Sequence, residues 1–163
     1  MRPSVDTMKP KAKGTITLAV GLPGSGKSTY FARRGIHPLS SDTIRLWLLD
    51  DETDQSAQHL VFLTLRGLLQ ARLRLGRKRN YVDATNLTPR ERRPYFQLAA
   101  QYGYNVHAIY FNVPLETCLR RNRDRHRKVP KTVMERMAHR LVPPSRSEGF
   151  IRIVVVKGRK SAG

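Results

Sequence analysis

The chain has 163 residues, and 31 Lys and Arg against 12 Asp and Glu give a formal net charge of +19. One domain of this length buries enough surface for a stable core, so no second catalytic domain is expected. No apolar stretch approaches the roughly 18 residues of a membrane span. With no signal-like N-terminus and the single Cys118, this predicts a soluble, cytoplasmic protein that does not contact membranes.

Segments typical of strands and helices alternate along the chain. Residues 1–14 and 157–163 are basic and poor in apolar side chains, so we expect a flexible leader and a flexible tail. Between them the hydrophobic pattern predicts strands at 15–20, 80–84, 105–111 and 150–156, and helices from 27, after 40–42, at 56–75 and 89–102, from 114, and at 130–139. This alternation predicts one α/β domain over residues 15–156, with a mainly parallel sheet and right-handed crossovers.

A phosphate-binding loop follows the first predicted strand. The segment GLPGSGKST at 21–29 fits the pattern G-x-x-x-x-G-K-[ST] and lies between a predicted strand and a predicted helix, which is the context that the motif requires. Its glycines allow backbone N–H groups to surround phosphate oxygens. We expect a nucleoside triphosphate site formed by Gly24, Ser25, Gly26, Lys27, Ser28 and Thr29. Lys27 would reach the β- and γ-phosphates, and the Ser28 hydroxyl would bind Mg²⁺.

Two carboxylates follow the loop at positions suited to phosphoryl transfer. Asp42 and Arg45 are spaced i, i+3 at the start of a predicted helix, so both project from one face. A carboxylate beside an Arg can orient an attacking hydroxyl group, although a first-turn carboxylate and a surface Arg fit the same pattern. Asp83 ends a predicted strand, where a second carboxylate commonly orients Mg²⁺ through water.

The basic residues are concentrated in two runs. A charge of this size favours polyanions such as nucleic acid, whereas a single run is equally compatible with a solvated basic face. Aromatic residues do not interleave with the runs, and we expect Tyr30 and Trp47 in the core rather than stacked on bases. The runs consist of Arg72, Arg74, Arg77, Lys78 and Arg79, and of Arg120, Arg121, Arg123, Arg125, Arg127, Lys128 and Lys131.

Five strings resemble the kinase domain of end-healing 5′-hydroxyl polynucleotide kinases, within the wider group of P-loop kinases related to the zeta toxins. In chain order they are LPGSGKST, LSSDTIR, VDATNLTPRERR, VPLETCLRRNRDRHRKVPKTVMERM and PPSRSEGF. The resemblance covers nearly the whole chain between the tails. It implies a P-loop kinase fold, with three layers in α/β/α order and a helical lid over about 114–140.

The resemblance also implies an acceptor site. In these kinases the Asp of D-x-x-R is the general base for the 5′-hydroxyl, and the Arg holds the acceptor phosphate and the transferring group. The matching positions are Asp42 and Arg45. Thr85 and Asn86 lie where related kinases approach the acceptor, as does Val129, although a polar turn is an equally good interpretation of Thr85 and Asn86.

The lid of the family carries R-N-x-x-R followed shortly by V-P, and its arginines engage the ATP phosphates. The matching residues are Arg121 and Arg125, and Arg125 is the preferred catalytic residue. Some members have an acid immediately before Thr-Asn, where this chain has Ala84 and places Asp83 one residue earlier. By resemblance, residues 143–150 would contribute to the adenine pocket.

Together these features predict transfer of the γ-phosphate of ATP, with Mg²⁺, to the 5′-hydroxyl end of DNA or RNA. A separate phosphatase or ligase would then be a partner, since the family often fuses such an enzyme to the kinase. Two alternatives stay open, namely a kinase of a small acceptor such as a sugar, nucleoside or antibiotic, and a nucleic-acid-binding ATPase switch. The sequence does not distinguish DNA from RNA and does not give the oligomeric state.

Overall fold

The structure is a computed structural model that describes residues 9–126 and 128–158. The strands are β1 (Thr15–Val20), β2 (Leu39–Ser40), β3 (Arg79–Asp83), β4 (Asn105–Asn112) and β5 (Arg152–Lys157). The helices are α1 (Lys27–Arg33), α2 (Ser41–Leu49), α3 (Gln58–Arg74), α4 (Pro89–Tyr102), α5 (Leu115–Arg123), α6 (Lys131–Arg140) and the short 3₁₀ helix η1 (Arg146–Glu148). Most of the expected leader and tail, at 1–8 and 159–163, and Arg127 of the second basic run lie outside the described residues.

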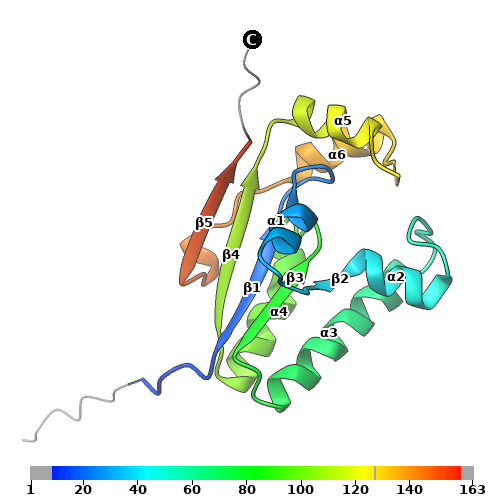
Figure 1. The fold of residues 1–163 in the computed structure, drawn as a ribbon. Coiled ribbons are helices and arrows are strands. Elements are labelled where there is room, and N and C mark those ends of the chain that lie inside the picture. The colour runs from blue at the N-terminus through cyan, green and yellow to red at the C-terminus, as the bar shows by residue number, and fades with distance from the viewer. Residues whose placement is uncertain (1–8, 127, 159–163) are drawn as a thin grey trace, which may run out of the picture.

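The five strands form one parallel sheet in the order β2-β3-β1-β4-β5 (Figure 1). β1 is the central strand, with Thr15 paired to Arg79 on one side and to Asn105 on the other. All of its residues after Thr15 are buried, because a central parallel strand is covered on both faces. The expectation of an α/β fold with a mainly parallel sheet is confirmed.

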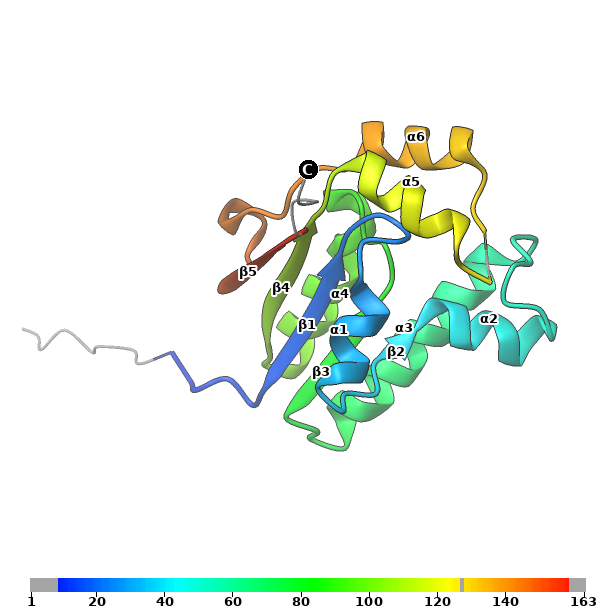
Figure 2. The same cartoon turned by 45° about the horizontal axis from the view of Figure 1, so that its top comes forward.

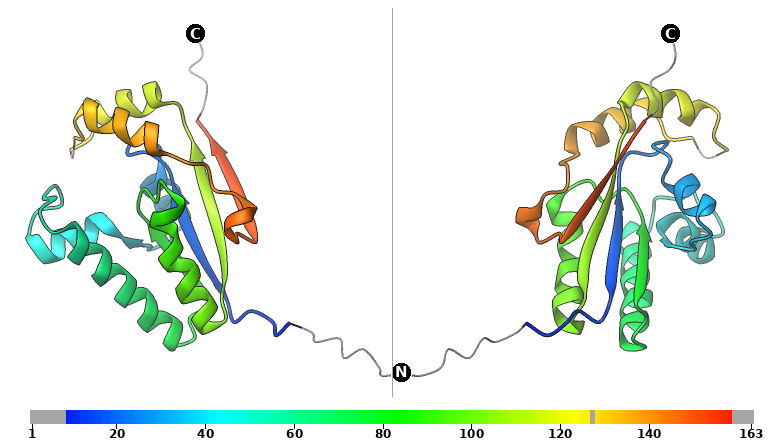
Figure 3. Two further views of the ribbon diagram at one scale, coloured as in Figure 1. Left: turned by 180° about the vertical axis from the view of Figure 1, so that it is seen from behind. Right: turned by 60° about the vertical axis from the view of Figure 1, so that its left-hand side comes forward.

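Different helices and different apolar clusters cover the two faces of the sheet. α3 and α4 pack on one face, where Leu65 and Tyr95 meet Leu18 of β1 in a large apolar cluster (Figure 3). On the other face α1, α5 and α6 enclose a second cluster that includes Phe31 and the fully buried Cys118. None of the described helices combines the length and the apolar content that a bilayer crossing needs.

The carboxyl ends of the strands meet at one edge of the sheet, and α5 and α6 lie across that edge (Figure 2). The phosphate loop follows β1, the start of α2 follows β2, a turn at 84–88 follows β3, and α5 follows β4. Open α/β sheets bind ligands in the crevice outside the carboxyl ends of their strands. The topology therefore brings four segments that are far apart in sequence to one place.

Trp47 is 67% exposed, so the expectation that it lies in the core is wrong. α2 turns Ile44 and Arg45 inward, and Trp47 falls on the solvent side of the same helix. Tyr30 is half-buried at the border of the core, where its ring meets Phe31 and Phe111 edge-on at centroid distances of 5.8 and 5.4 Å, and it also lines the cavity described below.

Candidate active site

The phosphate loop depends on two glycines in the left-handed region of backbone conformation. Gly24 has φ +80° and Gly26 has φ +98°. A Cβ at Gly24 would also lie 2.8 Å from the backbone oxygen of Cys118 in α5. Any other residue at these positions would strain the backbone, and at Gly24 it would push α5 away from the loop.

Lys27 begins α1 and is buried beneath the loop. Its Nζ donates to the backbone oxygens of Gly21 at 2.9 Å and Leu22 at 2.8 Å. Burial lowers the pKa of Lys27 to about 8, an effect that the Asp83 carboxylate opposes and the Arg125 guanidinium reinforces. The ammonium is therefore held in a place where an anionic ligand would stabilise its charge.

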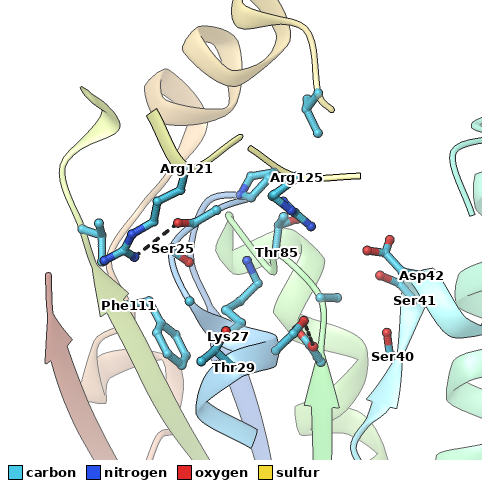
Figure 4. Close-up of a pocket in the computed structure, with 18 of the residues that line it drawn as sticks. Ser25, Lys27, Thr29, Ser40, Ser41, Asp42, Thr85, Phe111, Arg121 and Arg125 are labelled. Atoms are coloured by element: carbon cyan, nitrogen blue, oxygen red, sulfur yellow. Dashed lines mark hydrogen bonds between the residues drawn. The ribbon is translucent and has the colours of Figure 1, made fainter. Parts of the chain in front are cut away.

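One cavity of about 1260 Å³ at the carboxyl edge of the sheet is lined by most of the predicted site residues (Figure 4). Two polar atoms of its lining, Ser25 Oγ and Arg125 Nη1, are buried without a hydrogen-bond partner among the described residues. Buried donors normally have partners, so these two atoms fit a ligand rich in acceptor oxygens. The other predicted residues in the lining are Gly24, Gly26, Lys27, Ser28, Thr29, Asp42, Arg45, Asp83, Thr85, Arg121 and Val129.

Ser28 and Asp83 form a pair of hard oxygen ligands beside the phosphate loop. The Ser28 hydroxyl donates to Asp83 Oδ2 at 3.0 Å. Burial raises the pKa of the Asp83 carboxyl, although the nearby Lys27 ammonium and the hydrogen bond from Ser28 both act to lower it. A hydroxyl and a carboxylate at a phosphate site are the protein ligands that Mg²⁺ uses, with water and phosphate oxygens completing its shell. These two residues therefore fit the ion.

Asp42 lies across the cavity from Lys27 (Figure 4), and Arg45 lines the same cavity. Arg45 is only 2% exposed, so it is not a surface residue. Its Nη1 donates to Asp42 Oδ1 at 2.8 Å, and its Nη2 donates to Gln58 Oε1 on α3. The helix cap is Ser40, whose side chain accepts from the Thr43 N–H, and this leaves Asp42 directed into the cavity.

Thr85 and Asn86 follow β3, but only Thr85 lines the cavity. Asn86 is buried with φ +47°, and its Nδ2 donates to the backbone oxygen of Ala19 at 2.8 Å. The structure therefore does not bring Asn86 to the expected acceptor contact. Its amide fastens the turn to β1, while the Gly21 N–H donates to Thr85 O at 3.1 Å and joins that turn to the phosphate loop.

Arg121 and Arg125 reach the cavity from the lid (Figure 4). Arg121 Nη1 donates to the backbone oxygen of Gly24 at 3.4 Å, which places this guanidinium against the phosphate loop. Val129, at the end of the turn that joins α5 to α6, also lines the cavity. The lid thus adds two positive side chains to the cavity, and one of them lies against the phosphate loop.

The segment 143–150 does not line this cavity, contrary to expectation. Phe150 instead packs on Phe96 of α4, with ring centroids 4.8 Å apart. The wall next to the lid comes from the end of β5, through Val155, Val156, Lys157 and Gly158, and from Phe111 of β4. Strand ends are hard to assign to a cavity from sequence, because the assignment depends on which strand is at the edge of the sheet.

Arg92 is a fully buried side chain that the sequence analysis missed. It makes a two-pronged ion pair with Glu148, at 2.8 and 2.9 Å, and its Nη1 donates to the backbone oxygens of Asn86 and Val142. The one sequence signal is its spacing from Tyr95 and Ala99, at i+3 and i+7, which marks the buried stripe of α4. Arg92 thereby holds the turn after β3 against the segment that follows the lid.

Comparison with known proteins agrees with this fold. A proposed kinase from Chloroflexus aurantiacus has a TM-score of 0.70 at 14% identity, with 90% of this chain and 86% of that chain covered. A chain of the Pnkp1/Rnl/Hen1 RNA repair complex has a TM-score of 0.69 at 20% identity, covering 85% of this chain but only 47% of its own length. The gluconokinase of Sinorhizobium meliloti has a TM-score of 0.57 at 18% identity, with 90% and 83% covered.

A family model described as an AAA domain matches residues 16–144. The match begins in β1 and ends beyond α6, so it includes the phosphate loop, the Asp42 and Arg45 pair and the lid. This chain therefore belongs to that AAA domain family and has the α/β fold of the P-loop kinases.

Proposed function

We propose that this protein transfers the γ-phosphate of ATP to the 5′-hydroxyl end of DNA or RNA, with Mg²⁺ as the cofactor. The observation that carries the proposal is the position of the Asp42 and Arg45 pair. Its 2.8 Å ion pair faces the same cavity as Lys27 and the lid arginines, from the opposite wall. A phosphate donor and a hydroxyl acceptor can therefore meet between the two walls.

On the donor side, the side chains surround the triphosphate with positive charge. Lys27 would contact the β- and γ-phosphates, and Arg121 and Arg125 would approach them from the lid. Ser28 and Asp83 would hold Mg²⁺, which neutralises charge on the phosphate oxygens when bound. Positioning and charge neutralisation supply most of the catalysis in phosphoryl transfer.

On the acceptor side, Asp42 would accept the proton of the attacking hydroxyl group. The new bond joins that oxygen to the γ-phosphorus, the bond to the β-bridging oxygen breaks, and ADP leaves. Arg45 holds Asp42 in place and adds positive charge beside the transferring group. Its second hydrogen bond, which Gln58 Oε1 of α3 accepts, also holds the guanidinium in place.

Two observations favour a polynucleotide as the acceptor. The net charge of +19 attracts polyanions, and the described lid run borders the cavity through Arg121, Arg125 and Lys128. A chain in an RNA repair complex has the same fold. We further propose that a separate phosphatase or ligase processes the same ends and that both enzymes act in the cytoplasm.

A small hydroxylated acceptor is the second candidate. The cavity wall next to Asp42 includes the neutral side chains of Thr53, Gln55 and Gln58, which suit a sugar-like molecule. A gluconokinase and an adenylyl-sulfate (APS) kinase are among the similar structures. Such an acceptor would not need the positive field, so its phosphorylation should be nearly indifferent to moderate salt.

The test is transfer of labelled γ-phosphate to a 5′-hydroxyl oligonucleotide by the wild type and by Asp42→Asn. Removing a general base costs about 10²- to 10⁴-fold in rate, so labelling by Asp42→Asn should fall by that factor while ATP still binds. Asp50→Asn is the matched control, since Asp50 ends the same helix on the exposed side. Its αL conformation, at φ +57°, accepts Asn readily. Labelling by Asp42→Asn at the wild-type rate would contradict the assignment of the base.

A further inference from the structure

Asn122 closes the turn at the tip of the lid. It lies in the last turn of α5, where it is only 6% exposed. Its Nδ2 donates to the backbone oxygen of Val129 at 2.7 Å, and its Oδ1 accepts from the Val129 N–H at 2.9 Å. One side-chain amide thus pairs with both backbone groups of a residue seven positions further along the chain.

Among the described residues of the turn, few other hydrogen bonds fix the backbone. The Arg125 N–H donates to Asn122 O at 3.3 Å, and the next backbone bond in chain order runs from Val133 N to Pro130 O. Neither of these bonds connects the two ends of the turn. Among the described residues, the two hydrogen bonds of the Asn122 amide therefore connect the end of α5 to the residues just before α6.

The closed turn carries side chains that line the same cavity as the phosphate loop. Arg125 and Lys128 both line the cavity. Arg125 Nη1 is buried without a hydrogen-bond partner among the described residues, so no described hydrogen bond at this atom fixes the guanidinium. A shift of the turn backbone would therefore move this guanidinium without breaking a hydrogen bond at Nη1.

We propose that Asn122 is a positioning residue that sets Arg125 over the phosphate loop by clasping Val129. A primary amide suits this role because it donates and accepts at once, whereas a carboxylate only accepts and an apolar side chain does neither. The catalytic part of this inference rests on the proposed phosphoryl transfer. The structural part, which is the link from Asn122 to Arg125, does not depend on the acceptor.

The experiment is a double-mutant cycle with Asn122→Ala, Arg125→Ala and the double variant. A misplacement of a catalytic group by about 1 Å can cost about 100-fold, so we expect Asn122→Ala to lower kcat for oligonucleotide phosphorylation about 10- to 100-fold. The double variant should be no slower than Arg125→Ala alone, since the two residues act as one unit.

Asn122→Asp retains the size of the side chain and the acceptor for Val129 N–H, and its kcat should fall between those of the wild type and Asn122→Ala. Asn80→Ala is the matched control, because this buried amide also bonds to backbone, at Thr15 O and Arg77 O, but at the start of β3. Its kcat, measured well below its Tm, should equal that of the wild type. Additive losses in the double variant, or wild-type kcat in folded Asn122→Ala, would overturn the proposal.

A second readout separates this inference from the proposed function. ATP and ADP affinities are measured by calorimetry for all members of the cycle, without any acceptor. Asn122→Ala and Arg125→Ala should each reduce the preference for ATP over ADP, and the double variant should reduce it no further. If the wild type labels no oligonucleotide, the proposed function fails. The positioning role of Asn122 is then tested by the preference for ATP over ADP alone.

Discussion

The fold shifts the pKa of one residue of the phosphate loop, Lys27. Its ammonium is buried under the phosphate loop and held by two backbone oxygens, and burial lowers its pKa to about 8 against an ordinary value of 10.5. In the unfolded chain the same group is protonated up to a much higher pH. The folded state therefore gains stability from Lys27 as the pH rises from about 8 to 10.5, and loses that gain at lower pH.

Nucleotide binding should reverse this shift. Phosphate oxygens favour the charged ammonium, so ATP binding should raise the pKa of Lys27 and take up close to one proton at pH 9 but little at pH 7. Calorimetry in buffers of different ionisation enthalpy measures the uptake. Lys27→Arg, which stays charged throughout, should show none. Equal proton uptake at pH 7 and pH 9 by the wild type would contradict the assignment.

The sequence could predict the residues whose chemistry is local. The loop at 21–29 is readable from its spacing, whereas the spacing of Asp42 and Arg45 left a surface Arg open and only the resemblance favoured an acceptor site. Asn86 and Trp47 are not, since their surroundings depend on distant segments. Asn86 bonds to β1 across 67 positions in sequence, and Trp47 is exposed because α2 turns its other face to the protein.

At the scale of elements, a buried ion pair joins α4 to η1. Arg92 and Glu148 are 56 positions apart in sequence, yet both prongs of the guanidinium reach the carboxylate, and its remaining nitrogen contacts Asn86 O and Val142 O. Neighbouring Glu91 accepts from Leu87 N–H and from Arg140 at the end of α6. The first turn of α4 therefore fastens the end of the lid to the turn after β3.

Neutralising one partner of the Arg92 and Glu148 pair should lower the free energy of unfolding strongly. Glu148→Gln leaves the Arg92 charge buried without its counter-ion, and such changes typically lower the free energy of unfolding by about 3–5 kcal/mol. Lys131→Ala removes an exposed pair with Glu135, whose charged atoms lie 3.9 Å apart, and should cost at most about 1 kcal/mol. Urea unfolding measures both. Equal losses in the two variants would show that the Arg92 pair does not hold these elements together.

Element prediction succeeded where the local pattern is strong. The predicted limits of the strand at 15–20 and of the helix at 89–102 match β1 and α4, the second because Thr88 caps the helix and Pro89 opens it. β2 was missed because two residues carry no periodicity, and its strand character comes only from pairing Leu39 and Ser40 with β3. η1 was missed although Ser145 and Glu148 have the S-x-x-E spacing of a capping box, which the structure shows at its start.

At the scale of the whole molecule, the two basic runs lie at opposite ends of the sheet. The run from Arg72 to Arg79 spans the end of α3 and the start of β3, at the amino edge (Figure 1). The described residues of the lid run lie at the carboxyl edge, where Arg121, Arg125 and Lys128 border the cavity. The charge total in the sequence could not show this separation, and only the lid run is placed to meet an acceptor that enters the site.

This separation predicts which charges control the response to salt. Phosphorylation of an oligonucleotide should weaken steeply with salt, by about 10³-fold in kcat/KM between 50 and 200 mM if about six phosphates are contacted. Arg123→Gln, an exposed change in the lid, should make the slope of log kcat/KM against log salt shallower. Arg77→Gln, its matched control at the far edge, should leave the slope unchanged. Equal effects of the two variants would show that the acceptor does not follow the lid.

The measurement that tests the central claim most directly is the choice of acceptor end. The wild type, ATP labelled at the γ-phosphate and Mg²⁺ are incubated with DNA and RNA oligonucleotides that differ only in carrying a 5′-hydroxyl or a 5′-phosphate. We predict that the label enters only the 5′-hydroxyl oligonucleotides and that nuclease digestion releases it on the 5′-terminal nucleotide. Absence of label from every oligonucleotide, with a folded protein that binds ATP, would contradict the proposed function.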